Sequence, residues 1–205
     1  MPDTTHQPTK TGKFPPRRVP NASRRPREYL TASEVDRLVA AARKLGRHGE
    51  RDAALILIAF RHGLRVSELV ALRWAQVDLR AGLLHVRRVK NGVDTVQPLR
   101  GPELRLLRAL ERRYGAVTGG YVFVSERGGP LSAAAVRKIV ERAGRAAGLD
   151  FPVHPHMLRH ATGFYLAAKG EDTRAIQAYL GHRSIQHTVR YTALAPGRFE
   201  RFWTD

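Results

Sequence analysis

The polar residues that interrupt apolar helical patterns are the first candidates for chemistry in this chain. In the string HPHMLRHATGFYLAA, His156, Arg159 and His160 fall at i, i+3 and i+4, so they share one face of the expected helix. Grouping cationic and protonatable side chains in this way is costly unless an anion lies against them. A phosphate with two charged non-bridging oxygens is such an anion, so the stripe indicates a site for phosphoryl chemistry.

Two further candidates precede this stripe in the sequence. Arg65 opens an expected helix, and Glu68 at i+3 is close enough to hold its guanidinium. Taken alone, such an ion pair is also typical of a solvated surface. Lys90 precedes the dipeptide Asn91-Gly92 and is expected at the tip of a β-ribbon, where an ammonium can enter a DNA groove and donate a proton. Most lysines at such tips only protect a sheet edge.

The string GHRSIQHTVRYT holds the last two candidates, His182 and Tyr191. A tyrosine on a short helix is usually a packing residue. A phenol has a pKa of about 10 and needs a base and electrostatic help to act as a nucleophile at neutral pH. The other candidates supply both, so the complete set favours Tyr191 as a reagent.

A zinc site is the competing interpretation of the histidines at His154, His156 and His160. No Asp or Glu lies among them, and Arg159 places a fixed positive charge between the would-be ligands. We therefore expect no metal. A packing role for His160, one turn from Phe164, stays open.

The composition indicates a nucleic-acid partner. The chain has 205 residues, enough for one sizeable domain, and its 36 Lys+Arg against 18 Asp+Glu give a formal charge of +18. The sequence has neither a long apolar span nor a basic amphipathic helix, so a membrane is not favoured as the partner. The absence of cysteine excludes disulfides, thiolate metal ligands and cysteine nucleophiles. The N-terminus lacks the apolar stretch of an export signal, which suits a cytoplasmic protein.

The elements that must position the candidates are mostly helical. Residues 1–28 hold six of the twelve prolines and seven Lys or Arg against two acidic residues, which predicts a disordered basic arm that either contacts DNA or only aids solubility. The expected class is mainly α with a small antiparallel β-sheet or hairpin (α+β). Periodicity predicts a hairpin over 82–99, a short strand over 121–124, and helices within 30–46, 51–62, 102–115, 132–148, 154–170, 172–182 and 184–192.

The ordered candidates resemble the tyrosine recombinase (phage integrase) family. The strings GLRVSELVALRW, HPHMLRHATG and YLGHRSIQHTVRYT look like the sequence boxes of that family, and the resemblance runs from about residue 29 to 199. It implies a catalytic domain over 29–205, and the chain departs from larger members in that only the basic arm precedes this domain, with no N-terminal core-binding domain. The aromatic tail at about 196–205 either covers its own core or, as we expect, docks in trans onto a neighbouring subunit. The short length is most similar to the Fim-type recombinases. The residues that carry the resemblance are Arg65, Lys90, His156, Arg159, His182 and Tyr191.

The resemblance implies a role for each of these residues. Tyr191 attacks the scissile phosphodiester, forms a 3′-phosphotyrosyl link and releases a 5′-hydroxyl, with no need for a metal, ATP or a cofactor. Arg65 and Arg159 clamp the non-bridging oxygens, and His182 adds a third donor. His156 is the candidate base for the phenol. Lys90 is the candidate acid for the leaving oxygen.

The resemblance also implies partners and a biological role. The partners are double-stranded DNA with inverted-repeat sites, further copies of the chain in a tetramer on two sites, and DNA-bending accessory proteins, all at the bacterial nucleoid. The implied function is inversion of a promoter-bearing DNA segment in fimbrial phase variation. Three alternatives stay open: an integrase or resolvase of a mobile element, a type IB topoisomerase, and a DNA-binding transcription regulator without catalysis.

Overall fold

A computed structural model of the chain describes residues 28–89, 92–115 and 120–193. The expected basic arm, apart from Glu28, lies outside the described residues, as do Lys90 and the expected C-terminal tail. Every helix that the periodicity predicts is present, so the mainly α class is confirmed. The helices are α2 (Ala32–Lys44), α3 (Gly49–Arg61), α4 (Val66–Val70), α5 (Gly101–Tyr114), α6 (Ala133–Ala146), α7 (Pro155–Ala168), α8 (Thr173–Leu180) and α9 (Gln186–Ala193).

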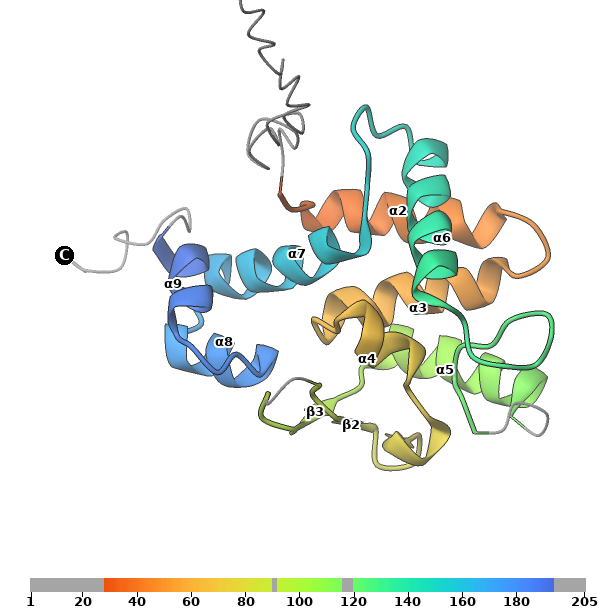
Figure 1. Ribbon diagram of the computed structural model, residues 1–205, viewed down its shortest axis with the longest axis horizontal. Helices are drawn as coiled ribbons and strands as arrows, with labels where there is room; N and C mark the ends of the chain where they lie inside the picture. The colour runs from red at the N-terminus through yellow and green to blue at the C-terminus, as the bar shows by residue number, and fades with distance from the viewer. Residues whose placement is uncertain (1–27, 90–91, 116–119, 194–205) are drawn as a thin grey trace, which may run out of the picture.

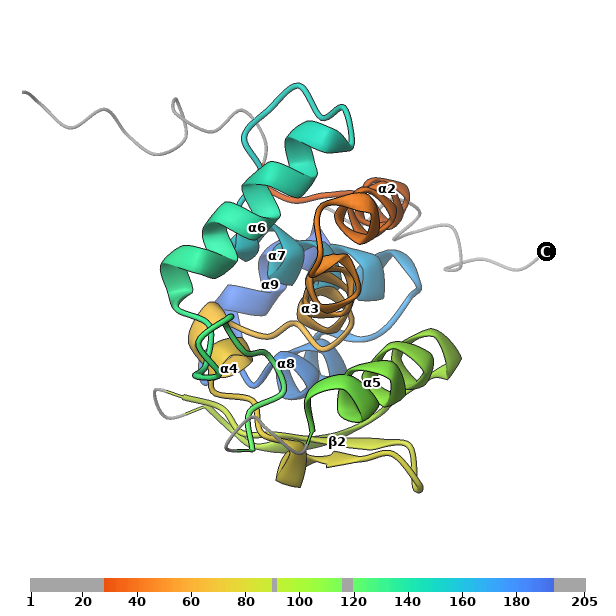
Figure 2. The same cartoon turned by 90° about the vertical axis from the view of Figure 1, so that its right-hand side faces the viewer.

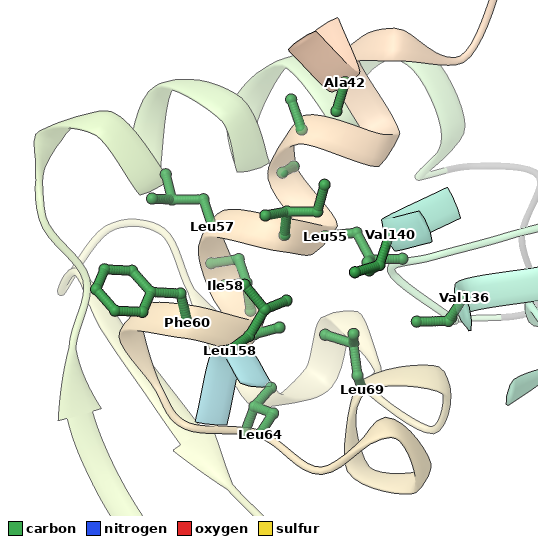
Figure 3. Close-up of a cluster of buried hydrophobic side chains, with 14 of the residues drawn as sticks. Ala42, Leu55, Leu57, Ile58, Phe60, Leu64, Leu69, Val136, Val140 and Leu158 are labelled. Carbon is green, nitrogen blue, oxygen red and sulfur yellow. The ribbon is translucent and has the colours of Figure 1, made fainter. Parts of the chain in front are cut away.

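Helix α3 lies at the centre of the molecule and contacts α2, α4, α5 and α7 (Figures 1 and 2). Its residues from Arg51 to Phe60 are all buried, because the segment is apolar on most sides and cannot turn a face to solvent. Figure 3 shows Leu55 and Ile58 of α3 packed among side chains of the neighbouring helices. Gly63 follows the helix end with φ of +56°, as expected for a C′ residue, and turns the chain toward Arg65.

A three-stranded antiparallel sheet lies along one side of the helical body, next to α5 (Figure 2). Its strands are β1 (Val77–Asp78), β2 (Leu83–Val86) and β3 (Thr95–Pro98), in the order β1-β2-β3. The hairpin expected over 82–99 is confirmed, and its ladder ends at the pair Val86 and Thr95. The periodicity did not predict β1, which has only two residues.

The strand expected over 121–124 is wrong. Tyr121 and Val124 form only isolated bridges, with Arg73 and Pro130 respectively. The backbone N–H of Val122 donates to the carbonyl of Leu72 instead of to a neighbouring strand. The apolar side chains of Val122 and Phe123 belong to the main hydrophobic core, and burial alone does not distinguish such a segment from a strand.

A second, smaller apolar cluster joins the end of α7 to α8 and α9, and these two short helices lie at one end of the molecule (Figure 1). The side chain of Asp172 caps α8, accepting from the backbone N–H groups of Arg174 and Ala175 at 2.7 and 3.1 Å. Helix α9 begins at Gln186, whose N–H donates to Ser184 Oγ at 3.3 Å. None of the described helices is long and apolar enough to cross a membrane.

Candidate active site

Arg65 stands at the N-cap of α4, where Glu68 holds it as the i, i+3 spacing predicts. Glu68 Oε2 accepts from the Arg65 backbone N–H at 2.9 Å, and Oε1 accepts from Arg65 Nη1 at 2.7 Å. The Arg65 side chain is 30% exposed while that of Glu68 is 1% exposed. Burial alone would raise the pKa of Glu68, but the bond from the Arg65 backbone and the charge of Arg88 outweigh it and lower the pKa. Glu68 is therefore an ionised, buried carboxylate that fixes the position of the Arg65 guanidinium.

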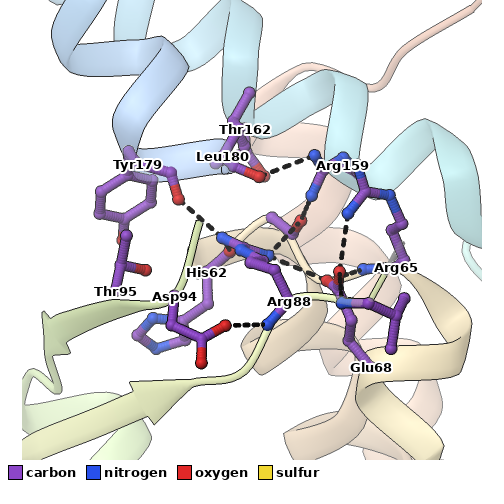
Figure 4. A network of polar contacts seen from close by, with 12 residues as sticks. His62, Arg65, Glu68, Arg88, Asp94, Thr95, Arg159, Thr162, Tyr179 and Leu180 are labelled. Atoms are coloured by element: carbon purple, nitrogen blue, oxygen red, sulfur yellow. Dashed lines mark hydrogen bonds and ion pairs between the residues drawn. The ribbon is translucent and has the colours of Figure 1, made fainter. Parts of the chain in front are cut away.

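Arg159 of α7 lies deep in the same site and ties two loops together. Its Nη1 donates to the carbonyl of Gly63, and its Nη2 donates to the carbonyl of Leu180 at 2.8 Å (Figure 4). Arg159 is only 2% exposed. Burial, with Arg65 and Arg88 nearby, lowers its pKa to about 9, so the guanidinium remains charged at neutral pH. Its backbone contacts fix the guanidinium between the end of α3 and the end of α8.

His182 follows Gly181 in the connection from α8 to α9. Its Nδ1 lies 2.8 Å from the hydroxyl of Thr188, which is fully buried on α9. Burial, and then the charges of Arg159 and Arg65, lower the pKa of His182 to about 3. The imidazole is therefore neutral at pH 7, and the two guanidiniums lie close enough to act on it.

Tyr191 of α9 is packed against α7 and turned away from solvent. It is 2% exposed, and its hydroxyl lies 2.9 Å from Nδ1 of His160. The ring meets Phe164 edge-on with centroids 5.1 Å apart, and a Cβ built on Gly163 would lie 2.5 Å from its Cε2. Burial raises the pKa of Tyr191. In the described conformation the phenol of Tyr191 is therefore protonated and enclosed.

The histidine stripe of α7 is present, and its two histidines differ in their surroundings. His156 is exposed, and its ring lies edge-on to that of His160 with centroids 4.3 Å apart. His160 is part-buried, and burial followed by the neighbouring His156 lowers its pKa to about 3. The structure therefore places His160 beside the tyrosine hydroxyl, whereas the resemblance had suggested His156 as the base.

The structure brings together five of the six expected residues, while Lys90 lies outside the described residues. It also adds two polar residues that the sequence had not placed behind the site: Thr188, which is bonded to His182, and the buried Arg88, which binds Glu68. Thr188 stands six residues after His182, and α9 begins between them. Helical periodicity therefore does not predict their contact. Arg88 continues the inward alternation of Leu84 and Val86 while Arg87 is exposed, but the alternation does not indicate which groups meet Arg88 inside.

Two fixed guanidiniums, a neutral imidazole and a phenol form a site suited to a phosphodiester and a covalent oxygen nucleophile. The phage integrase family model matches residues 28–198. The type 1 fimbriae regulatory protein FimE of Escherichia coli (strain K12) is 47% identical over 181 residues, covering 86% of this chain and 91% of that protein.

Solved structures agree with this family. The crystal structure of the XerA recombinase superposes with a TM-score of 0.74 at 28% identity, covering 90% of this chain and 68% of that one. The XerH site-specific recombinase, bound to its difH substrate in a pre-cleavage complex, gives 0.70 at 25% identity, covering 81% of this chain and 50% of that one. The chain therefore belongs to the phage integrase family and is a Fim-type site-specific tyrosine recombinase.

Proposed function

We propose that Tyr191 is the nucleophile of this recombinase. The Tyr191 oxygen forms a bond to the scissile phosphorus, the bond to the 5′-oxygen breaks, and that oxygen leaves with a proton as a hydroxyl. The reverse attack by a partner strand's 5′-hydroxyl rejoins the DNA and frees the phenol. The observation that carries this proposal is the convergence of Arg65, Arg159 and His182 beside the helix of Tyr191, from segments that are far apart in the sequence.

Arg65 and Arg159 are the proposed clamp for the two non-bridging oxygens. A guanidinium has five N–H donors. Arg159 gives two of its groups to the Gly63 and Leu180 carbonyls, and Arg65 gives one to Glu68. The remaining donors suit the planar, charge-assisted hydrogen bonds that a phosphoryl oxygen accepts.

His182 is the proposed third donor, and Thr188 sets its tautomer. A neutral imidazole carries one N–H, and a phosphate oxygen requires a donor. The Thr188 hydroxyl can donate to Nδ1 across the 2.8 Å separation, which leaves the proton on Nε2. His182 then offers an N–H to the phosphate without needing a positive charge.

The proposed resting state of the nucleophile is its bond with His160. The phenol must leave His160 and its enclosed position before it can reach a phosphate, because it is 2% exposed. His156 lies on the exposed part of the same stripe and is the proposed base once the phenol has moved. Lys90 is the proposed acid for the 5′-oxygen.

The proposed substrate is a promoter-bearing segment of chromosomal DNA, flanked by inverted repeats, which the enzyme inverts in the bacterial cytoplasm. The similarity to a fimbriae regulatory protein over most of both chains supports this choice. The DNA-bound XerH neighbour supports duplex DNA as the partner. A tetramer on two sites, with DNA-bending accessory proteins, completes the proposed assembly.

Covalent capture tests the proposed chemistry. The chain is incubated with randomly nicked chromosomal fragments from the organism that encodes it, and protein–DNA adducts that survive denaturation are purified and sequenced. We expect adducts at one pair of inverted repeats, and inversion of the segment between those repeats when it is placed in a plasmid. Tyr191→Phe should bind the same DNA and form no adduct. An adduct on that variant, or none on the unaltered chain, contradicts the proposal.

A further inference from the structure

A third arginine lies behind the proposed phosphate clamp, and its side chain has no exposed surface. Arg88 follows β2, and its guanidinium turns inward to reach three separate segments (Figure 4). Nη1 donates to Glu68 Oε2 at 2.9 Å, and Nη2 donates to the carbonyls of Tyr179 at 2.6 Å and His62 at 3.2 Å. One side chain thus joins the end of α3, the start of α4 and the end of α8.

Two glycines make room for the stem of Arg88. A Cβ on Gly92 would lie 2.7 Å from Arg88 Cβ, and a Cβ on Gly181 would lie 2.8 Å from Arg88 Cγ. Real Cβ atoms do not approach other atoms so closely, so both positions require glycine while Arg88 keeps this path. Gly92 belongs to the connection between β2 and β3, and Gly181 precedes His182. Arg88 is therefore packed between two loops that carry proposed catalytic groups.

The charge of Arg88 also matters to the clamp. Glu68 binds Arg65 through Oε1 and Arg88 through Oε2, so the three side chains together carry one net positive charge. Without Arg88, the Glu68 carboxylate would have Arg65 as its only cationic partner in this group, and the pair would carry no net charge. A neutral pair attracts a phosphate less than a cation does, and the difference grows where burial lowers the local dielectric, as it does around Glu68 and Arg88.

We propose that Arg88 is a positioning residue for the phosphate clamp. It offsets the charge of Glu68, so that Arg65 meets the phosphate as a full cation, and it fixes the distance from the clamp to the His182 loop. The inference rests on the proposed function, because it concerns the same site.

The test uses cleavage of a nicked duplex carrying the repeat identified by covalent capture, under single-turnover conditions with saturating protein. The dissociation constant for the same duplex is measured in parallel. Arg88→Met should cleave about 10- to 100-fold more slowly with unchanged affinity, the usual loss when a supporting contact is removed. Arg87→Met is the matched control, because it removes the same charge from the exposed neighbouring side chain. That variant should keep the cleavage rate.

A second substitution separates a charge effect from a folding defect. Glu68→Gln should slow cleavage in the unaltered chain, because it loosens Arg65. In the Arg88→Met background it should accelerate cleavage, because it removes a carboxylate that no longer has a second partner. A merely structural role predicts slowing in both backgrounds, and that result overturns the inference. Equal cleavage by Arg88→Met and Arg87→Met also overturns it. An unaltered chain that does not cleave refutes the proposed function instead.

Discussion

Replacing Gly163 by alanine tests the enclosed position of Tyr191. Gly163 lies inside α7, beneath the tyrosine ring. A Cβ there would lie 2.5 Å from Cε2, 2.6 Å from Cδ2 and 2.7 Å from Cζ of Tyr191. The ring cannot simply rotate away, because its hydroxyl is hydrogen-bonded to His160 and the ring packs in the smaller apolar cluster of α7, α8 and α9. The added methyl group should therefore destabilise the conformation in which Tyr191 is enclosed.

Two opposing effects set the size of the change. Alanine stabilises a helix interior by about 0.8–1.0 kcal/mol relative to glycine, whether or not the tyrosine is enclosed. Overpacking costs about 1–3 kcal/mol, and only while the ring occupies its site. The free energy of unfolding should therefore fall by up to about 2 kcal/mol. The balance between enclosed and released tyrosine should shift toward release by about 5- to 150-fold, the equivalent of 1–3 kcal/mol.

Urea unfolding of four chains measures the effect: the unaltered chain, Gly163→Ala, Tyr191→Ala and the double variant. In the Tyr191→Ala background the methyl group has no ring to meet, so Gly163→Ala should stabilise the protein by about 1 kcal/mol. Amide hydrogen exchange over Gln186–Ala193 should be faster in the single variant Gly163→Ala than in the unaltered chain. Equal stabilisation in both backgrounds would refute the enclosed packing.

The remaining predictions concern the part-buried histidines His160 and His182. Thr188→Val keeps the shape of the side chain but removes the hydroxyl that is hydrogen-bonded to His182, so single-turnover cleavage should slow by about 10- to 100-fold. Thr188→Ser keeps the hydroxyl and should cleave normally. Normal cleavage by Thr188→Val would show that the hydroxyl does not set the tautomer of His182. Folding lowers the pKa of His160 and His182 to about 3 from about 6.5, so the unfolded chain binds more protons between these values. The free energy of unfolding should therefore be highest above about pH 6.5 and should fall as the pH is lowered toward 3. Urea unfolding across this range should show a shallower decline for the double variant His160→Asn/His182→Asn, and identical slopes would contradict it.

The amino-acid sequence determined those features that depend on neighbours within one or two helical turns. The capping box of Thr31 and Glu34 at the start of α2, the ion pair of Arg65 with Glu68, and the histidine stripe of α7 all follow from spacings of three or four residues. Such contacts form whenever the local element forms, so their residue types and spacing suffice to predict them.

Only the tertiary structure decided which polar residues lie behind the site and where the phenol rests. Period-two alternation places Arg87 and Arg88 on opposite faces, yet the segments that enclose Arg88 meet only in the folded chain. The contact of Tyr191 with His160 joins residues 31 positions apart. Periodicity says which face of a helix is buried, but the partner of that face depends on how distant elements pack. For that reason the residue types and their spacing suffice to propose the reagents, while the side chains that support them and the enclosed position of Tyr191 depend on the folded chain.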